Sequence, residues 1–194
     1  MNGGKFEFSN QSDFSDAKII HTIDRAVPYY NDLFTKSLSA FRYVRYLSPV
    51  GGCGNVSILE FYDENNKKLQ GTVIGTPGIN AATSNDKVFD GDVDTYFEAA
   101  SDPSWVGLDF GEPRRISKIR YLPRTTGNGI YEGHVYELIY WNGKEWHSLG
   151  QQTATSHILQ FRAPANALFF LKNITKNRMY HTPFLIESGA QRWF

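Results

Sequence analysis

Three aspartates at alternate positions are the clearest candidates for metal chemistry in this chain. Asp90, Asp92 and Asp94 stand in the stretch "VFDGDVDTYFEAA". Their spacing matches positions 1, 3 and 5 of an EF-hand calcium loop, in which position 6 is a glycine and position 12 a glutamate. Here those two positions hold Thr95 and Ser101. The sequence therefore excludes an EF-hand, and it leaves open another oxygen-ligand site or a turn that the aspartates stabilise themselves.

Sequence motifs of catalysis are absent. The chain has no G-x-S-x-G elbow, no P-loop and no dinucleotide-binding fingerprint. Cys53 is the single cysteine, which excludes an internal disulfide and a cysteine-based zinc site. The five histidines lack the spacing of a metal-binding pair. We therefore expect a protein that is not an enzyme.

Composition limits the partners. The 194 residues include 20 Lys and Arg against 20 Asp and Glu, so the formal net charge is zero and nothing favours nucleic acid as a partner. No apolar run is long enough to span a membrane, so we expect no membrane insertion. The first residues, "MNGGKFEF", do not resemble a signal peptide. Either the protein is cytoplasmic, or the chain is a fragment of a longer exported protein.

Short alternating runs predict the elements that must position these residues. They recur from "KFEFS" at residue 5 to "PFLIES" at residue 183, and include "ILQFRA" at residues 158–163. Period-two alternation with 15% aromatic residues is typical of β-strands, so we predict an all-β fold. The Asn-Gly in "YWNGKEW" predicts a hairpin. Residues 29–41 are the nearest approach to a helix.

A half-repeat suggests two modules. Residues 5–23 resemble residues 135–150 in the order of strand, polar turn, aromatic residue and strand, and the segments that follow each of them also correspond. We therefore predict a partial module at residues 1–74 and a complete one at residues 78–194. Half a sandwich exposes sheet edges and an apolar face, so its partner strands must come from upstream sequence, from the second module or from another chain. We expect the half-module to pack on its neighbour.

The order of motifs in the second half resembles a known family. The motifs are "VFDGDVDTYF", "SWVGLDFG", "ISKIRYLPR" and "YWNGKEWHSLG", and they occur in the order of the discoidin, or coagulation-factor type C, domain. The chain also resembles tandem C-terminal modules of surface proteins of Bacteroides-type bacteria. This resemblance implies a jelly-roll β-sandwich of the galactose-binding type, preceded by a partial β-sandwich module. It also implies an extracellular, cell-surface or periplasmic full-length protein.

The same resemblance implies candidate calcium ligands. Many discoidin-type modules hold one structural Ca²⁺ in the loop that corresponds to the aspartates here. The residues that correspond are Val88, through its carbonyl, Asp90, Asp92, Thr95 and, near the C-terminus, Glu187. All offer hard oxygen donors, which suit calcium. The alternative is that Asp90 hydrogen-bonds within its own turn and no ion is bound.

Carbohydrate ligands are also implied by the resemblance. In sugar-binding members, the arginine after the proline and the asparagine before the glycine contact sugar hydroxyls. Carried over to this sequence, with neighbouring polar and aromatic positions, the candidates are Glu98, Arg124, Asn128, Tyr131, Tyr180 and His181. An arginine fork and an amide supply several fixed donors for adjacent hydroxyls.

Two functions follow as expectations. The first is a non-catalytic carbohydrate-binding module of a larger surface or secreted protein, with glycans and other domains of the same chain as partners. The second is a structural or adhesion module that contacts proteins or other domains without binding sugar.

Overall fold

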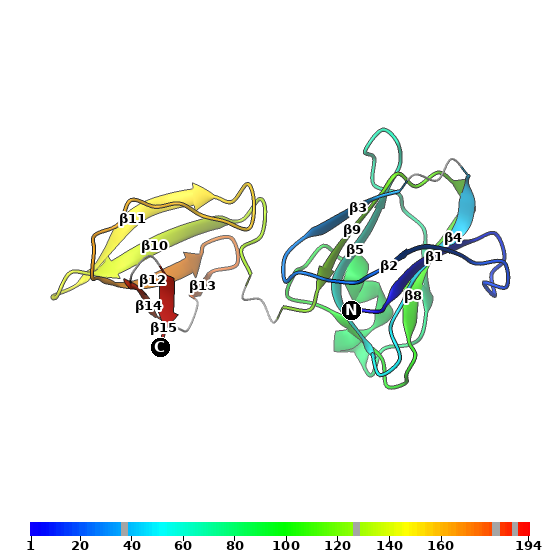
Figure 1. The fold of residues 1–194 in the computed structure, drawn as a ribbon, viewed down its shortest axis with the longest axis horizontal. Helices are drawn as coiled ribbons and strands as arrows, with labels where there is room; N and C mark the ends of the chain where they lie inside the picture. The colour runs from blue at the N-terminus through cyan, green and yellow to red at the C-terminus, as the bar shows by residue number, and fades with distance from the viewer. Residues whose placement is uncertain (36–38, 126–128, 180–182, 188–189) are drawn as a thin grey trace. The chain divides into compact units, whose positions relative to one another are not determined.

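The structure, a computed structural model, describes residues 1–35, 39–125, 129–179, 183–187 and 190–194 (Figure 1). Antiparallel strands make up nearly all of its regular structure. The helical elements of the described residues are two 3₁₀ turns, η1 (Ala81–Thr83) and η2 (Asn85–Phe89). The predicted all-β class is therefore confirmed. Within these same ranges, no helix is long and apolar enough to cross a membrane.

The chain divides into two compact units, residues 1–127 and residues 128–194, called unit 1 and unit 2. Unit 1 is a sandwich of a five-stranded sheet, β2-β1-β4-β8-β6, and a four-stranded sheet, β3-β9-β5-β7. Its strands are β1 (Lys5–Ser9), β2 (Lys18–Thr22), β3 (Asn31–Phe34), β4 (Phe41–Leu47), β5 (Gly54–Tyr62), β6 (Thr72–Gly75), β7 (Phe97–Glu98), β8 (Trp105–Arg114) and β9 (Lys118–Pro123). The sandwich is of the predicted kind, but it is built from residues 5–123, whereas the jelly roll was predicted at residues 78–194.

The core of unit 1 lies between the two sheets and follows from strand alternation. In β4, Val44 and Tyr46 are fully buried, while Arg45 between them lies on the other face and pairs with Glu7. From β1, the Phe6 ring packs 5.2 Å from the ring of Tyr121 in the opposite sheet. Aromatic side chains thus join the two layers.

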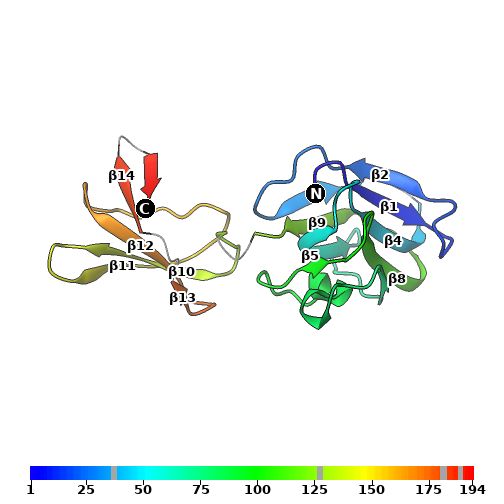
Figure 2. The same ribbon diagram turned by 90° about the horizontal axis from the view of Figure 1, so that it is seen from below.

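Both sheets of unit 1 combine strands from two parts of the sequence (Figure 2). The N-terminal segment, residues 5–62, contributes β1 to β5, and the central segment, residues 72–123, contributes β6 to β9. Strand β8 pairs with β4 along its length, and β9 lies between β3 and β5. The N-terminal half-module therefore obtains its partner strands from the second module, by sharing sheets with it. For this reason the predicted boundary, between residues 74 and 78, falls inside unit 1, and the units divide instead at residue 127.

Unit 2 is a single sheet in the order β11-β10-β12-β14-β15, with β13 also paired to β12. Its strands are β10 (Val135–Trp141), β11 (Trp146–Thr153), β12 (Leu168–Asn173), β13 (Arg178–Met179), β14 (Phe184–Glu187) and β15 (Ala190–Trp193). Among the described residues of unit 2, buried apolar side chains cluster around Phe169 and Phe184 and around Tyr136.

Local predictions had mixed outcomes. The predicted hairpin is present: Trp141 pairs with Trp146, and the backbone N–H of Asn142 donates to the Glu145 carbonyl over 3.2 Å. The strand predicted at residues 158–163 is wrong, because that segment has no regular structure. The helical tendency at residues 29–41 is also wrong where it is described, since residues 31–34 form β3 by pairing with β9.

Candidate functional site

Arg124 lies just after β9 and is held by three groups of unit 1. One terminal nitrogen, Nη1, lies 3.1 Å from Asn55 Oδ1 and 3.3 Å from Glu98 Oε2. The guanidinium carbon stands 3.7 Å from the centre of the Tyr96 ring, within the range of a cation–π contact. The side chains of Arg124 and Glu98 are 32% and 29% exposed. The structure thus brings together two predicted residues, Glu98 and Arg124, at the surface.

An irregularity in β5 brings Asn55 to this site. Gly54 pairs with Glu98 of β7 and Val56 pairs with Phe97, so the register shifts at Asn55. Asn55 takes a left-handed backbone conformation with φ of 56°, which asparagine tolerates better than most residues. Its carbonyl accepts a hydrogen bond from the Arg124 backbone N–H over 3.1 Å. A bulge of this kind redirects a side chain, here towards the arginine.

Asn55 and Tyr96, which both contact Arg124, were not predicted as site residues from the sequence. A signal for each is present. Asn55 follows a glycine directly before the apolar run that starts at Val56, and a glycine at a strand suggests a bulge. Tyr96 precedes Phe97, whose ring is fully buried, so alternation places Tyr96 on the opposite face.

Of the other predicted carbohydrate contacts, the structure describes Tyr131. Asn128, Tyr180 and His181 lie outside the described residues. Tyr131 belongs to unit 2 and is only 1% exposed. Its hydroxyl accepts a hydrogen bond from the Gly129 backbone N–H over 3.2 Å, and its ring packs edge-on against His134. In this structure Tyr131 therefore offers no ring face to a sugar.

The aspartates form consecutive hydrogen-bonded turns. The backbone N–H of Asp92 donates to Asp90 Oδ1 over 2.8 Å, and that of Asp94 donates to Asp92 Oδ1 over 2.9 Å. Gly91, between the first two aspartates, has φ of 78°, which glycine adopts without strain. The aspartates therefore stabilise the turn through their own side chains.

Oxygen atoms also crowd around the Thr95 hydroxyl. Both carboxylate oxygens of Asp90 lie 2.9 Å from it, the Asp92 carbonyl 3.0 Å and the Lys87 carbonyl 3.2 Å. A hydroxyl has one hydrogen and can donate to one acceptor at a time. Several hard oxygen donors thus converge on one point, which is the chemistry that Ca²⁺ prefers.

The remaining predicted calcium ligands, Val88 and Glu187, are not among the groups that surround the Thr95 hydroxyl. The Val88 side chain is fully buried, and the carbonyl beside Thr95 belongs to its neighbour, Lys87. Glu187 is part of β14 in unit 2, where its carboxylate lies 3.2 Å from Arg192 Nη1. Within the described ranges, no three His, Cys, Asp or Glu residues are grouped to hold a metal ion. An ion at the Asp90 loop would therefore need carbonyl and hydroxyl oxygens in addition to the aspartate carboxylates.

Comparison with known proteins gives one match. The family model of the F5/8 type C domain matches residues 72–182, more than half of the chain. No curated protein and no solved structure matches the sequence.

Proposed function

The chain belongs to the F5/8 type C, or discoidin, family, and on this basis we propose that it is a carbohydrate-binding module that recognises galactose-like glycans. Domains of this family are galactose-binding-like modules, generally non-catalytic and typically extracellular. The observation that supports the proposal is the surface cluster of Arg124, Glu98 and Asn55. We also propose that the module serves a larger surface or secreted protein, with other domains of that chain as partners.

The cluster suits a sugar because it combines the polar groups that vicinal hydroxyls need. The guanidinium donates hydrogen bonds, the Glu98 carboxylate accepts them, and the Asn55 amide does both. Opposite charges on Arg124 and Glu98 cancel, which suits a neutral ligand. Contact with the Tyr96 ring and with Asn55 restrains the guanidinium, so less side-chain entropy is lost when a ligand binds. Asn128, Tyr180 and His181 remain proposed contacts, and Tyr131 does not.

Calorimetry on a glycan identified by array screening tests the site. We expect Arg124→Ala to weaken binding at least tenfold, because it removes the donor fork. Arg120→Ala is a matched control, since Arg120 lies on β9, four residues before Arg124, and also pairs with a carboxylate, that of Asp32, over 2.6 Å. Arg120→Ala should bind like the wild type. Unchanged binding by Arg124→Ala would remove the site, and an array without any bound glycan would remove the function.

The alternative is a structural or adhesion module that binds no sugar. The observation that favours it is that Arg124 already has a carboxylate, an amide and an aromatic ring as partners within the protein. In that case Arg124 joins β5, β7 and the end of β9, and Arg124→Ala lowers the stability of unit 1 without any effect on glycan binding. Thermal unfolding of the same two variants distinguishes the alternatives.

One structural Ca²⁺ at the Asp90 loop is also part of the proposal. The Asp90 carboxylate, the Lys87 and Asp92 carbonyls and the Thr95 hydroxyl would hold it. Its role would be to join η2 to the following loop by neutralising the convergent oxygens, with no part in ligand chemistry.

A further inference from the structure

The two units contain three-stranded sheets of the same strand order, β2-β1-β4 in unit 1 and β11-β10-β12 in unit 2. An ion pair occupies the same place in each sheet. Glu7 faces Arg45 across β1 and β4, with 2.7 Å between the charged groups, and Glu137 faces Lys172 across β10 and β12, with 3.8 Å. Each hairpin also shifts register beside its glutamate. The paired strands therefore correspond residue by residue, with Arg45 equivalent to Lys172.

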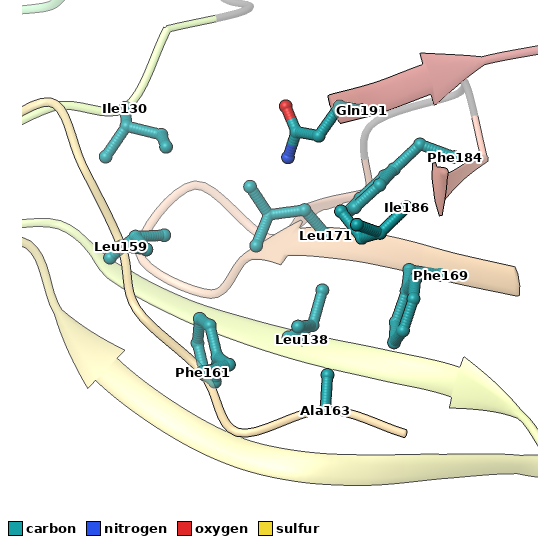
Figure 3. Close-up of a pocket in the computed structure, with 10 residues that line it drawn as sticks. All are labelled: Ile130, Leu138, Leu159, Phe161, Ala163, Phe169, Leu171, Phe184, Ile186 and Gln191. Carbon is teal, nitrogen blue, oxygen red and sulfur yellow. The ribbon is translucent and has the colours of Figure 1, made fainter. Parts of the chain in front are cut away.

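The sheet of unit 2 has an apolar pocket of about 300 Å³ on one face. Leu138 of β10 and Leu171 of β12 point into this pocket, together with Phe161 from the segment that precedes β12 (Figure 3). Side chains alternate between the two faces of a sheet. Ile139 and Trp141 of β10 therefore lie on the opposite face, which we call the outer face of unit 2.

Two tryptophans lie side by side on the outer face. Trp141 ends β10, Trp146 begins β11, and the two residues pair across the hairpin. Their ring centres are 5.5 Å apart, and each residue is 39% exposed. Ile139 beside them is only 7% exposed, so the two indoles border a packed surface. Neighbouring exposed apolar side chains of this kind are typical of a binding surface.

Trp146 has an equivalent in unit 1. In the half-repeat, the aromatic residue that follows the polar turn is Phe14 in unit 1 and Trp146 in unit 2. Ring contacts support this equivalence, because the Phe14 ring lies 6.3 Å from that of Tyr43 and the Trp146 ring lies 5.0 Å from that of Phe170. Tyr43 and Phe170 hold the same position in their strands, two residues before the basic member of each ion pair.

The two equivalent rings differ in how far they are covered. Phe14 is only 6% exposed. The guanidinium carbon of Arg45 lies 4.1 Å from the centre of its ring, and the Trp105 ring packs edge-on against it at 5.5 Å. Trp146 also contacts two aromatic rings, yet it keeps 39% exposure. The fold can therefore close this position, and in unit 2 the position is open to solvent.

Polar groups continue the outer face beyond the tryptophans. The Ser148 hydroxyl, two residues after Trp146 on β11, donates a hydrogen bond to Glu137 Oε1 over 2.7 Å, and Glu137 Oε2 lies 3.8 Å from Lys172 Nζ. An ammonium donates, a carboxylate accepts, and a hydroxyl does both. The charges of Glu137 and Lys172 are opposite, so this part of the face suits a neutral ligand with hydroxyl groups.

We propose that the outer face of unit 2 is a second carbohydrate site, which binds a β-linked galactose-type oligosaccharide. The class of ligand rests on the proposed function, whereas the site is new and belongs to the other unit than the Arg124 cluster. A pyranose ring has an apolar face of C–H groups and a rim of hydroxyls. Its C–H face stacks on an indole, whose ring face carries partial negative charge.

The length of the site sets the size of the ligand. Trp141 and Glu137 are four residues apart on β10, which is about 13 Å along a strand. This distance exceeds the length of one sugar ring. A ligand that contacts both the tryptophans and the polar groups of Ser148, Glu137 and Lys172 therefore contains at least two linked sugars.

An NMR titration of the full chain tests the proposal. The indole N–H signals of Trp141 and Trp146, assigned with Trp141→Phe and Trp146→Phe, are followed as galactose, β-linked galactobiose or β-linked galactotetraose is added. Galactitol is the control ligand, because it has the hydroxyls of galactose but no ring. We expect both signals to shift with the two oligosaccharides, the tetraose to bind at least tenfold more tightly than galactose, and galactitol to have no effect.

Variants separate this site from the Arg124 cluster. We expect Trp146→Ala to weaken galactotetraose binding at least tenfold, as reported by the Trp141 signal. His147→Ala is the matched control, since His147 adjoins Trp146 on β11 but its ring lies 5.7 Å from that of Tyr140 on the other face. It should bind like the wild type. If Trp146→Ala does not fold, the titration of the wild type decides.

The Arg124→Ala variant makes the two proposed sites distinguishable. Indole shifts that persist in Arg124→Ala support the site on unit 2, whether or not the Arg124 cluster binds glycans. Shifts that vanish in this variant overturn the proposal, and so does the absence of any shift with galactobiose and galactotetraose in the wild type. Indole signals that change on dilution of the protein alone also overturn it, because the outer face would then be an interface between two copies of the chain.

Discussion

Two sheets of the same strand order, β2-β1-β4 and β11-β10-β12, differ in how far their apolar faces are covered. The first is one layer of a sandwich with a continuous core, and the second carries a partly open apolar face. Strand order, register and the cross-strand ion pair are the same in both. The difference shows that hairpins and neighbouring strands can form from local sequence, whereas the core requires a second layer from elsewhere in the chain.

Equivalent side chains, Phe8 at 1% and Leu138 at 7% exposed, are both buried, and the difference lies in the size of the cluster around each. Phe8 and Leu138 each lie one position after the paired glutamate, and both point to the apolar side of their sheet. Phe8 packs in the large core of unit 1, and Leu138 borders the pocket of unit 2. Hydrophobic stabilisation increases with the apolar area removed from water, so unit 1 should be much the more stable of the two.

The largest expected effect comes from truncating these two residues. We expect Phe8→Ala to lower the free energy of unfolding of unit 1 by about 3–5 kcal/mol, the usual cost of removing a buried phenylalanine. Leu138→Ala should cost unit 2 about 2 kcal/mol, the lower end of the usual range for a buried leucine, because the adjoining pocket leaves fewer contacts to lose. Hydrogen exchange followed segment by segment in urea measures both. Equal costs would mean that a second layer covers unit 2 in solution.

Calcium should increase the difference in stability between the two units, because its proposed site lies in unit 1 alone. At free calcium a hundredfold above the dissociation constant, binding stabilises unit 1 by about 2.7 kcal/mol and leaves unit 2 unchanged. Thermal unfolding with calcium and with chelator measures the effect.

Asp90→Asn is the matched variant for the calcium prediction. The amide oxygen can still accept the hydrogen bond from the Asp92 backbone N–H, but the negative charge is gone. We expect the calcium response to disappear while the melting temperature in chelator stays nearly the same. If calcium and chelator give the same melting temperature in the wild type, the aspartates serve only the turn.

Much of the fold could be predicted from the sequence, because its signals are local. Alternation predicted the strands, Asn-Gly predicted the hairpin, and the half-repeat anticipated the correspondence between β1 and β10. The assignment of partners could not be predicted in this way. Strand β8 has the same alternating pattern whether it pairs with β4 or with β12, so periodicity does not show which sheet it joins.

The candidate site, like the sheets, depends on contacts between distant residues that local sequence does not predict. Glu98 and Arg124 were predicted through the family resemblance, because the motifs that carry them are continuous in the sequence. Asn55 was missed because its approach to Arg124 depends on a bulge in a strand that lies far away in the chain. A long-range contact of this kind leaves only a weak local signal, here an asparagine after a glycine.

The smallest expected effect is a decrease in the stability of unit 1 at acid pH. Two ion pairs join the N-terminal segment to the central segment: Asp32 with Arg120, and Arg42 with Asp109. Hydrogen bonds from the arginines lower the pKa of both Asp32 and Asp109. A lowered pKa in the folded state means that each carboxylate stabilises folding above its unfolded pKa, near 3.9, and that this contribution is lost as the pH falls through the folded value.

Hydrogen exchange of β3 and β9 between pH 5 and pH 3 measures this decrease in stability. The Asp32 pair is partly exposed, so its contribution is about 1 kcal/mol or less. Asp32→Asn should therefore reduce the acid sensitivity of these strands and leave β10 and β12 of unit 2 unaffected. If β10 and β12 respond to acid through Asp32 as strongly as β9 does, the contrast between the two units does not hold in solution.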